Sequence, residues 1–583
     1  MSVIKRNSKD RTNYFPIKGG IKMDKKIIVI GGVAAGASAA AKARRNNENL
    51  EIVIYEKGPY VSFANCGLPY YIGRDIKRRE NLFLMTPELF WDRYKILVKV
   101  SHEVTKINRE EKYVEVTNLI TGETFKDYYD KLVIATGGTP IKPPIPGIDL
   151  NNIFTLFTVK DVDAIEEALA SGEIKEVTVI GGGYIGLEAT EAFLKRGMKV
   201  TLVEKAESLL PYLDGELAIP LALHLEDLGV EVILGDGIQS FNGDEGKVKN
   251  ITLESGKVIP TDLAIVAIGA KPQVDLARDA GLEIGSQGGV VVDAAMRTSD
   301  PNIYAGGDIV ETMHLVTHKR VRIPLAGPAN KQGRIIGANI TGDNKIFKGL
   351  LGTSIVKVGD LTAAKTGLSE KEAKKEGFAY FVSYTPSLDH ASYYPGAKYM
   401  LTKLVVEEQS GRILGGQIVG WQGVDKRIDV LATAIYANMT VEDLENLDLA
   451  YAPPYSSAKD PVITAGYVAA NILRGETKVK TPEQVNEAIN LLTRDKKLQI
   501  IDVRTKGEVE KGAIPGAIHI PIDELRERAN ELNPEDDIAL YCRVGYRSYL
   551  GYKILKNLGF ENVYNICGGY MGYKCDVGGI KPR

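Results

Sequence analysis

Residues 177–186 read Val-Thr-Val-Ile-Gly-Gly-Gly-Tyr-Ile-Gly, an apolar run that leads into a glycine-rich turn. A helical pattern over residues 187–196 and a second apolar run over 199–203 follow, and that run ends in Glu204. Strand, G-x-G-x-x-G turn, helix and strand in this order predict a βαβ unit that holds a dinucleotide pyrophosphate at the helix N-terminus. The glycines of the turn are Gly181, Gly183 and Gly186.

The acid at the end of the second strand indicates which nicotinamide cofactor binds. Glu204 can accept both hydroxyls of an adenosine ribose and would repel a 2′-phosphate. This favours NADH. Lys205 is adjacent and weakens the preference, so NADPH stays open.

A second, less regular copy of the pattern lies nearer the N-terminus. An apolar run over residues 27–30 leads into Gly31-Gly32-Val33-Ala34-Ala35-Gly36, a small-residue helix over 37–45 and a strand over 52–55, which is followed by Glu56 and Lys57. Gly31 and Gly36 supply the tight turn and the close helix packing, although Val33 replaces the middle glycine. We expect a second dinucleotide site with Gly31, Gly36, Glu56 and Lys57 as binding residues. The alternative is a plain βα crossover.

Two later segments connect this first copy to a flavin. Residues 131–135 form an apolar run before Thr136-Gly137-Gly138, and residues 298–308 form a strand and glycine turn that end in Asp308. The arrangement resembles the second FAD fingerprint of flavoprotein disulfide reductases with two dinucleotide domains. The resemblance implies that Asp308 binds the ribityl chain of FAD. Two cofactors in one chain imply hydride transfer from nicotinamide to flavin.

The predicted fold class is α/β, with several domains. We expect an FAD-binding domain, an inserted Rossmann-like NAD-binding domain, an α/β dimerisation domain with strands at 399–407 and 413–419, a linker and a C-terminal α/β domain. Their expected bounds are 23–150 with 275–345, 151–274, 346–474, 475–482 and 483–583.

The run Tyr60-Val61-Ser62-Phe63-Ala64-Asn65-Cys66-Gly67-Leu68-Pro69-Tyr70-Tyr71 contains the candidate redox residue. We expect Cys66 at a helix N-terminus, which would lower its pKa and make it nucleophilic. A buried cysteine that packs as a small hydrophobe is the alternative. Tyr71 stands where a C-x-x-x-x-C pair would place the second cysteine, and the other cysteines lie in the last domain. Cys66 must therefore cycle through a mixed disulfide, a persulfide or a sulfenic acid.

From Met23 onward the chain resembles the coenzyme A disulfide reductases, and more closely their rhodanese-fused and NADH-dependent persulfide reductase relatives. The resemblance implies that Cys66 alternates between thiolate and mixed disulfide with coenzyme A, positioned by Ser62 and Asn65. Related NADH oxidases and peroxidases carry a histidine in the first glycine turn, where this chain has Ala34 and Ala35. An oxidase or peroxidase is therefore the less favoured alternative.

The same resemblance implies a homodimer in which two tyrosines of the partner subunit lie over the active site. The candidates are Tyr393 and Tyr451, with Tyr394 and Tyr455 as neighbouring choices. A phenol can donate a proton to a departing thiolate. Core packing is the alternative role.

Coenzyme A carries phosphates, so a basic site is expected near Cys66. Arg44 and Arg45 end the first helix, and Lys77 begins a Lys-Arg-Arg run after the redox segment. Such clusters also mark ordinary solvated faces.

The last hundred or so residues carry a second cysteine motif. Asp502-Val503-Arg504, then Gly512-Ala513-Ile514-Pro515-Gly516-Ala517, then Cys542-Arg543-Val544-Gly545-Tyr546-Arg547-Ser548 resemble single-domain rhodanese modules. A loop cysteine at a helix N-terminus, with Arg543 and Arg547 nearby, favours a thiolate or persulfide anion. A phosphatase loop would need the arginine one residue later. Cys567 and Cys575 we interpret as core residues, and a sulfurtransferase relay is a further alternative function.

Bulk composition excludes other classes. The 583 residues carry a net charge of −2, which predicts no attraction to nucleic acid or anionic membranes. Four cysteines make no disulfide framework, and the six histidines show no zinc spacing, so we expect no metal and a reducing cytoplasm. The polar residues 1–22 lack a secretory signal, and we expect a disordered extension before Met23.

Overall fold

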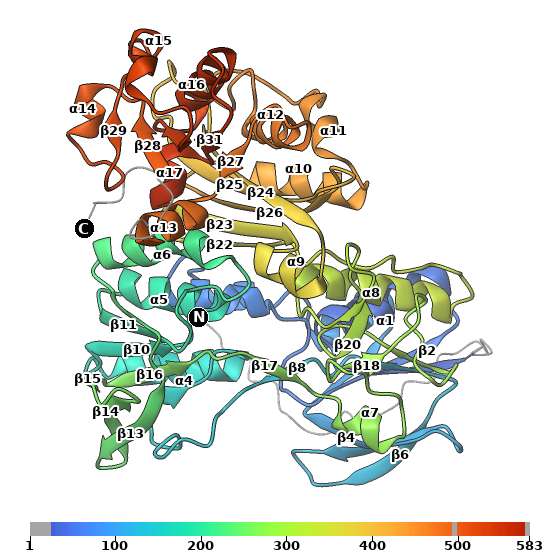
Figure 1. Ribbon diagram of the computed structural model, residues 1–583. Coiled ribbons are helices and arrows are strands. Elements are labelled where there is room, and N and C mark those ends of the chain that lie inside the picture. The colour runs from blue at the N-terminus through green and yellow to red at the C-terminus, as the bar shows by residue number, and fades with distance from the viewer. Residues whose placement is uncertain (1–24, 492–497, 576, 578–583) are drawn as a thin grey trace.

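The computed structural model describes residues 25–491, 498–575 and 577, so the predicted extension over residues 1–22 lies outside the described residues. The chain forms four units. Figure 1 shows the two nucleotide units side by side, the antiparallel sheet of a third unit above them and the C-terminal unit on top of that sheet. We call the last two the interface unit and the C-terminal unit.

The first nucleotide unit is built on a parallel sheet of order β19-β7-β1-β2-β3. Helix α1 (Ala34–Asn46) follows β1 and packs on α8 (Ala326–Ile340). Small residues allow this contact, because a Cβ added at Gly333 would lie 2.3 Å from the carbonyl oxygen of Ala35. The strands are β1 (Lys26–Ile30), β2 (Glu51–Glu56), β3 (Leu97–Val100), β7 (Lys131–Ile134) and β19 (Ile303–Ala305).

The second nucleotide unit repeats the plan with a parallel sheet of order β12-β11-β10-β16-β9. Its apolar strands are covered on both faces, as parallel sheets require. Its strands are β9 (Ile153–Phe154), β10 (Glu176–Ile180), β11 (Lys199–Glu204), β12 (Glu231–Leu234) and β16 (Leu263–Val266), and its helices are α4 (Val159–Ala170), α5 (Tyr184–Lys195) and α6 (Gly215–Asp227).

The chain passes between the two nucleotide units twice, and the two crossings pair with each other. Strand β8 (Gly138–Pro140) leaves the first unit, and β17 (Ala270–Pro272) returns antiparallel to it. Each nucleotide unit also carries an antiparallel three-stranded sheet, formed by β4 (His102–Asn108), β5 (Tyr113–Asn118) and β6 (Thr124–Tyr128) in one and by β13 (Ile238–Asp244), β14 (Lys247–Leu253) and β15 (Val258–Pro260) in the other.

The interface unit is an antiparallel sheet of order β22-β23-β26-β25-β24. Strand β26 is buried along its whole length, so both faces of the sheet are covered. The unit consists of β22 (Ser354–Val358), β23 (Leu361–Gly367), β24 (Tyr380–Leu388), β25 (Tyr399–Glu407), β26 (Ile413–Gly420), α9 (Glu370–Glu376), α10 (Val424–Tyr436), α11 (Val441–Glu445) and α12 (Pro461–Leu473).

The C-terminal unit has a parallel sheet of order β27-β31-β30-β28-β29. Part of the predicted linker 475–482 is structured, because β27 (Val479–Lys480) pairs with β31 at the sheet edge. The other elements are α13 (Pro482–Leu491), β28 (Leu498–Asp502), α14 (Lys506–Val509), β29 (Ile518–His519), α15 (Leu525–Arg528), β30 (Asp537–Tyr541), α16 (Tyr546–Asn557), β31 (Val563–Ile566) and α17 (Gly569–Lys574).

Cys567 and Cys575 pack between the C-terminal unit and the interface unit. Both are buried in the same apolar cluster as residues of β24, β25 and β26. The Cys567 sulfur accepts a hydrogen bond from the Tyr384 amide at 3.1 Å. Burial raises the pKa of Cys567 to about 11 and that of Cys575 to about 12, so both are neutral core thiols, as expected.

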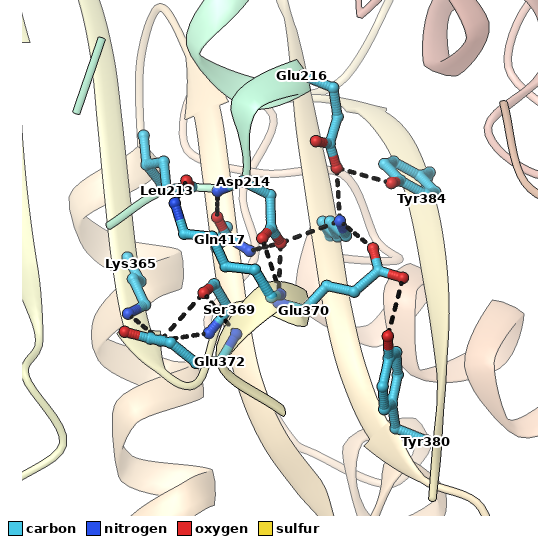
Figure 2. A network of polar contacts seen from close by, with 12 residues as sticks. Leu213, Asp214, Glu216, Lys365, Ser369, Glu370, Glu372, Tyr380, Tyr384 and Gln417 are labelled. Atoms are coloured by element: carbon cyan, nitrogen blue, oxygen red, sulfur yellow. Dashed lines mark hydrogen bonds and ion pairs between the residues drawn. The ribbon is translucent and has the colours of Figure 1, made fainter. Parts of the chain in front are cut away.

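A buried lysine joins the second nucleotide unit to the interface unit. The carboxylates of Asp214, Glu216 and Glu370 converge (Figure 2), and the fully buried ammonium of Lys403 lies 2.9 Å from Asp214 and 2.6 Å from Glu370. The Tyr384 hydroxyl donates to Glu216 at 2.8 Å. Tyr384 thus touches three units. The three acids could group as metal ligands, but the ammonium of Lys403 lies among them and offsets one of their negative charges.

Within the part of the chain that the structure describes, no helix combines the length and apolarity needed to cross a bilayer.

Candidate functional site

The two glycine turns open onto one shared cavity of about 2630 Å³. Gly31 lines it from the first nucleotide unit and Gly181 from the second. Cys66 lines the same cavity, and none of the other cysteines that the structure describes does. The two glycine turns and the Cys66 thiol therefore lie in one continuous chamber.

The first turn has the geometry of a dinucleotide site. Gly31 adopts φ +92°, and an added Cβ would lie 2.3 Å from the Ala135 carbonyl oxygen, so only glycine fits. The Glu56 carboxylate accepts the amides of Gly32 at 2.9 Å and Gly58 at 2.7 Å. Burial raises the pKa of Glu56, and the two amide bonds oppose that rise. The acid thus faces the turn, where a ribose would lie.

The second turn repeats these contacts. Gly181 has φ +106°, and Glu204 accepts the amides of Gly182 at 2.6 Å and Ala206 at 2.7 Å. A Cβ at Gly183 would meet only the Tyr212 hydroxyl, 3.7 Å away. Val33, at the matching position of the first turn, lines the cavity and is only partly buried. Lys205 is ion-paired with Glu254 at 2.8 Å, so its charge is partly neutralised.

Asp308 and Lys57 line the cavity beside the first turn. Asp308 follows Gly307, whose amide donates to the Gln332 side chain at 2.8 Å. Burial raises the pKa of Asp308, and nearby Arg322 opposes the rise. The Lys57 ammonium pairs with Glu103 at 2.6 Å. Two glycine turns, each with an acid bonded to its amides, and the partly buried Asp308 beside the first turn fit FAD there and a nicotinamide dinucleotide at the second turn.

The redox segment presents Cys66 to this chamber. Asn65–Gly67 form a single 3₁₀ turn, directly followed by α2 (Leu68–Ile72), so the expected helix start is present. Ser62 has φ +49°, a strained value for serine, and Ser62, Asn65 and Cys66 all line the cavity. The cavity wall therefore brings these three residues together, and the role expected of Ser62 and Asn65 stays a prediction.

The predicted low pKa of Cys66 is wrong for this arrangement. The Cys66 side chain is exposed, but the surrounding protein partly desolvates its thiol and so raises its pKa, and the carboxylates of Glu188 and Asp308 raise it further. A helix of five residues has a weak N-terminal field, and the two acids outweigh it.

Sequence reasoning missed several polar groups at and beside the cavity wall. The Tyr70 hydroxyl donates to the Glu188 carboxylate at 3.0 Å, and the rings of Tyr184 and Tyr212 stack with centroids 4.5 Å apart at the second turn. Tyr70 follows Cys66 by four residues, about one helical turn, and this spacing could have identified it from the sequence. Glu188 lies inside a helix and had no local signal.

Tyr393 and Tyr451, two of the four candidate tyrosines, lie side by side. Their hydroxyls are 2.8 Å apart, although 58 residues separate them, and the hydrogen bond raises the pKa of Tyr393. Both rings are exposed, at 73% and 48%. They do not belong to the described residues that line the cavity of their own chain.

Arg44 is not a phosphate anchor, and that prediction is wrong. Its side chain is 3% exposed, and its guanidinium donates to the main-chain carbonyls of Tyr94, Glu48, Leu50 and Lys95. Arg45 and Lys77 are exposed, and neither is among the described residues that line the cavity.

Cys542 follows β30 and lies under the loop that enters α16. Its sulfur accepts the Gly545 amide at 3.2 Å and the Ser548 hydroxyl at 3.6 Å, and the side chain is fully buried. Arg547 forms two hydrogen bonds to Glu508, which lower the pKa of that acid to about 2. The Arg543 guanidinium lies over the Tyr399 ring, 4.8 Å from its centre, and so links the loop to the interface unit.

Comparison with known proteins gives three family matches. The pyridine nucleotide-disulphide oxidoreductase model matches residues 25–333, its dimerisation-domain model matches 353–461 and the rhodanese-like domain model matches 484–575. The coenzyme A disulfide reductase of Staphylococcus aureus is 36% identical over 445 residues, which are 76% of this chain and 99% of the relative.

Two solved structures resemble nearly the whole chain. The reduced CoADR-RHD of Bacillus anthracis has a TM-score of 0.91 and 44% identity, with 94% of this chain and 97% of the other covered. A NAD-dependent persulfide reductase from A. fulgidus has a TM-score of 0.87 and 42% identity, with 94% and 100% covered. With both nucleotide units, the interface unit and the C-terminal unit matched, the chain belongs to the pyridine nucleotide-disulphide oxidoreductase family and carries a C-terminal rhodanese-like domain.

Proposed function

We propose that the chain is an FAD-containing, NADH-dependent reductase of coenzyme A disulfide or of a persulfide carried by coenzyme A. The observation that carries this proposal is the exposed thiol of Cys66 in the shared cavity, with the other three cysteines buried elsewhere. The relatives named above for coenzyme A disulfide and persulfide reduction support the substrate class.

The cofactors are proposed from the two turns. FAD would be held by Gly31, Gly36, Glu56, Lys57 and Asp308, and NADH by Gly181, Gly183, Gly186 and Glu204. FAD would supply the path by which the electron pair of NADH reaches sulfur. Glu204 supports NADH over NADPH because it would face a 2′-phosphate.

Cys66 is proposed as the nucleophile. Its thiolate attacks one sulfur of the disulfide, an S–S bond to Cys66 forms, and one coenzyme A thiolate leaves. Two electrons from NADH then break the mixed disulfide, which restores Cys66 and releases the second thiol. With a persulfide as substrate, hydrosulfide leaves instead. Ser62 and Asn65 would orient the substrate sulfur.

The tyrosine pair is proposed to protonate the leaving thiolate from the partner subunit of a homodimer. Tyr393 and Tyr451 are exposed on the interface unit and share a hydrogen bond. A hydrogen-bonded pair can pass one proton outward and recover it from the neighbouring hydroxyl.

Cys542 is proposed to carry sulfane sulfur. A persulfide there would be stabilised by the Gly545 amide and the Arg547 guanidinium. The sulfur would pass to coenzyme A or to the Cys66 site.

Charge reversal at Lys77 or Arg45 tests the coenzyme A phosphate site. We expect Lys77→Glu to raise KM for coenzyme A disulfide several-fold and to leave KM for a small aromatic disulfide unchanged, because a carboxylate there repels the phosphates. Steady-state NADH oxidation measures both. Lys249→Glu, at an exposed position of β14, makes the same charge change and should alter neither KM. An equal loss on both substrates would contradict the assignment.

The experiment for the function is anaerobic NADH oxidation by the holoenzyme with coenzyme A disulfide, coenzyme A persulfide or hydrogen peroxide. We expect rapid turnover with a coenzyme A substrate and slow turnover with peroxide. Fast peroxide turnover would support a peroxidase instead. NADH oxidation with none of the three, alongside sulfur transfer from thiosulfate, would support a sulfurtransferase relay.

A further inference from the structure

The two exposed tyrosines of the interface unit stand on loops whose bases are buried. The first tyrosine loop, residues 389–398, joins β24 to β25, and the second tyrosine loop, residues 446–460, joins α11 to α12. Asp389 is buried at the base of the first loop, whereas Tyr393 near its tip is exposed, and the second loop likewise has a buried residue, Ser456. An exposed tip with few contacts of its own takes its position from the base of its loop.

One buried guanidinium bonds to both bases. Arg427, on α10, is 2% exposed, and its Nη2 donates to the main-chain oxygen of Asp389 at 2.9 Å and to that of Tyr455 at 3.2 Å. Each of these two carbonyl groups stands four residues from one tyrosine of the pair. A single side chain therefore sets the separation of the two loop bases.

Asp460 holds this guanidinium in place. Its carboxylate accepts Nη2 of Arg427 at 3.0 Å and Nε at 3.2 Å, and it also caps α12 by accepting the Val462 amide at 3.0 Å. Asp460 is 2% exposed, like its partner. A guanidinium that bonds to a carboxylate through two nitrogens has a fixed orientation. Arg427 is therefore held rigidly between α10 and α12.

The first loop is also closed on itself and bonded directly to the second. Nδ1 of His390 lies 2.8 Å from Oδ1 of Asp389, and its Nε2 lies 3.2 Å from the carbonyl oxygen of Pro395. The Ala391 amide donates to the carbonyl oxygen of Pro453, in the second loop, at 3.4 Å. Both loops are thus held at their bases while the two tyrosine hydroxyls meet at their tips.

We propose that Arg427 is the positioning residue of the tyrosine pair, with His390 as its counterpart within the first loop. The inference rests on the proposed function, in which this pair protonates the departing thiolate. Arg427 acts through the loop bases, because its bonds go to their carbonyl groups. By fixing the separation of the bases it keeps the hydroxyls of Tyr393 and Tyr451 within hydrogen-bond distance.

The proton balance shows what this positioning supports. The S–H bond of the departing thiol forms as the O–H bond of one phenol breaks. That phenolate takes a proton from the neighbouring hydroxyl, which is reprotonated by water. Such a relay requires that the two oxygens stay at hydrogen-bond distance, which the buried loop bases ensure.

Arg427→Lys tests the proposal, since lysine keeps the charge beside Asp460 but lacks the planar fork that reaches both carbonyl groups. We expect kcat of the holoenzyme for coenzyme A disulfide to fall about tenfold to a hundredfold, the scale of loss for a displacement of about 1 Å. KM should be unchanged. A nitro-substituted aromatic disulfide should be reduced at the wild-type rate, because its thiolate leaves without a proton. Anaerobic NADH oxidation measures both substrates.

A double variant separates positioning from a merely structural role. Tyr393→Phe removes one hydroxyl of the pair and should cause the same loss, confined to coenzyme A disulfide. Addition of Arg427→Lys to Tyr393→Phe should then cost nothing further, because the guanidinium acts through that pair. The proposal is overturned if Arg427→Lys leaves both rates unchanged or slows both substrates equally, or if its cost adds to that of Tyr393→Phe.

Arg412→Lys is the matched control. Arg412 lies at the end of β25 opposite the first loop and pairs with Glu407 at 3.3 Å, so the same substitution is made away from that loop. Both rates should equal those of the wild type, and a loss confined to coenzyme A disulfide would overturn the proposal. Should Arg427→Lys fail to fold, His390→Asn replaces it, and a loss that is absent or equal for both substrates is the overturning result.

Hydrogen exchange distinguishes failure of this inference from failure of the proposed function. The amide of Ala391, which bonds to Pro453 across the two loops, should exchange faster in Arg427→Lys than in wild type or in Arg412→Lys. This readout needs no substrate. If the wild type does not reduce coenzyme A disulfide, the proposed function fails, whereas unchanged exchange at Ala391 in Arg427→Lys overturns the positioning role itself.

Discussion

Replacement of Cys66 by serine is expected to lower NADH-driven reduction of coenzyme A disulfide on the order of 10⁴-fold or more, the scale of loss when a covalent nucleophile is removed. No other thiol can substitute, because Cys542, Cys567 and Cys575 are buried in another part of the chain. Serine keeps the size of the side chain and its place before α2. Anaerobic loss of NADH absorbance measures the rate.

Cys542→Ser is the matched control. It makes the same chemical change in the C-terminal unit, and we expect it to retain disulfide reduction while it loses transfer of sulfur from thiosulfate to cyanide. NADH affinity should be unchanged in both variants, since the second turn and Glu204 are untouched. Disulfide reduction that survives in Cys66→Ser, or that disappears in Cys542→Ser, would contradict the assignment of roles.

Replacement of Lys403 by methionine is expected to destabilise the junction of the second nucleotide unit and the interface unit by about 3–5 kcal/mol, because it leaves the buried carboxylate of Asp214 without its cation, beside two partly buried acids. Burial alone would lower the pKa of Lys403, but Tyr384, Asp214, Glu216 and Glu370 outweigh it and raise that pKa. The ammonium is therefore charged throughout the accessible range. Native-state hydrogen exchange of β24, β25 and β26 measures the loss.

The effect of pH on this variant has a defined sign. In the wild type, burial raises the pKa of Asp214, but Lys403 and the hydrogen bonds outweigh burial and lower it. That contribution is present above the unfolded pKa and is lost as pH falls through the lowered folded value. Without Lys403 the acids favour protonation, so the deficit of the variant should be largest at neutral pH and shrink in acid.

Lys365→Met is the control for the Lys403 variant. Lys365 is also buried but pairs with one carboxylate, Glu372, whose side chain is 39% exposed. We expect it to cost less, because water compensates a partly exposed partner. An equal cost at both lysines, or a pH-independent deficit at Lys403, would refute the account of this junction.

The fold could be predicted largely from local sequence patterns, apart from the partly structured linker and an error in the start of both nucleotide helices. Both nucleotide helices were predicted to start three residues late, at 37 and 187, whereas α1 begins at Ala34 and α5 at Tyr184. The reason is that the last glycine of each turn lies inside the helix. A Cβ at Gly186 would lie 1.8 Å from the carbonyl oxygen of Gly181, so this glycine serves close packing rather than a turn.

Site residues could be predicted where a sequence motif contains them. They could not be predicted where tertiary packing determines the surroundings of the side chain. Cys66 and Asp308 stand in motifs, and both line the cavity. Arg44 belonged to a basic cluster, but the fold buries it against four carbonyls that no sequence pattern reveals. The rise in the pKa of Cys66 also depends on Glu188, which is 122 residues away and was invisible until α2 and α5 were seen to pack.

The most direct test of the central claim is peptide mass spectrometry of Cys66 after anaerobic acid quench of the holoenzyme with coenzyme A disulfide and limiting NADH. We predict that Cys66 carries one coenzyme A moiety in a mixed disulfide that disappears when NADH is in excess. A disulfide between Cys66 and any other cysteine of the protein, or an unmodified Cys66 during turnover, would contradict the claim that its oxidised form is shared with a diffusible thiol.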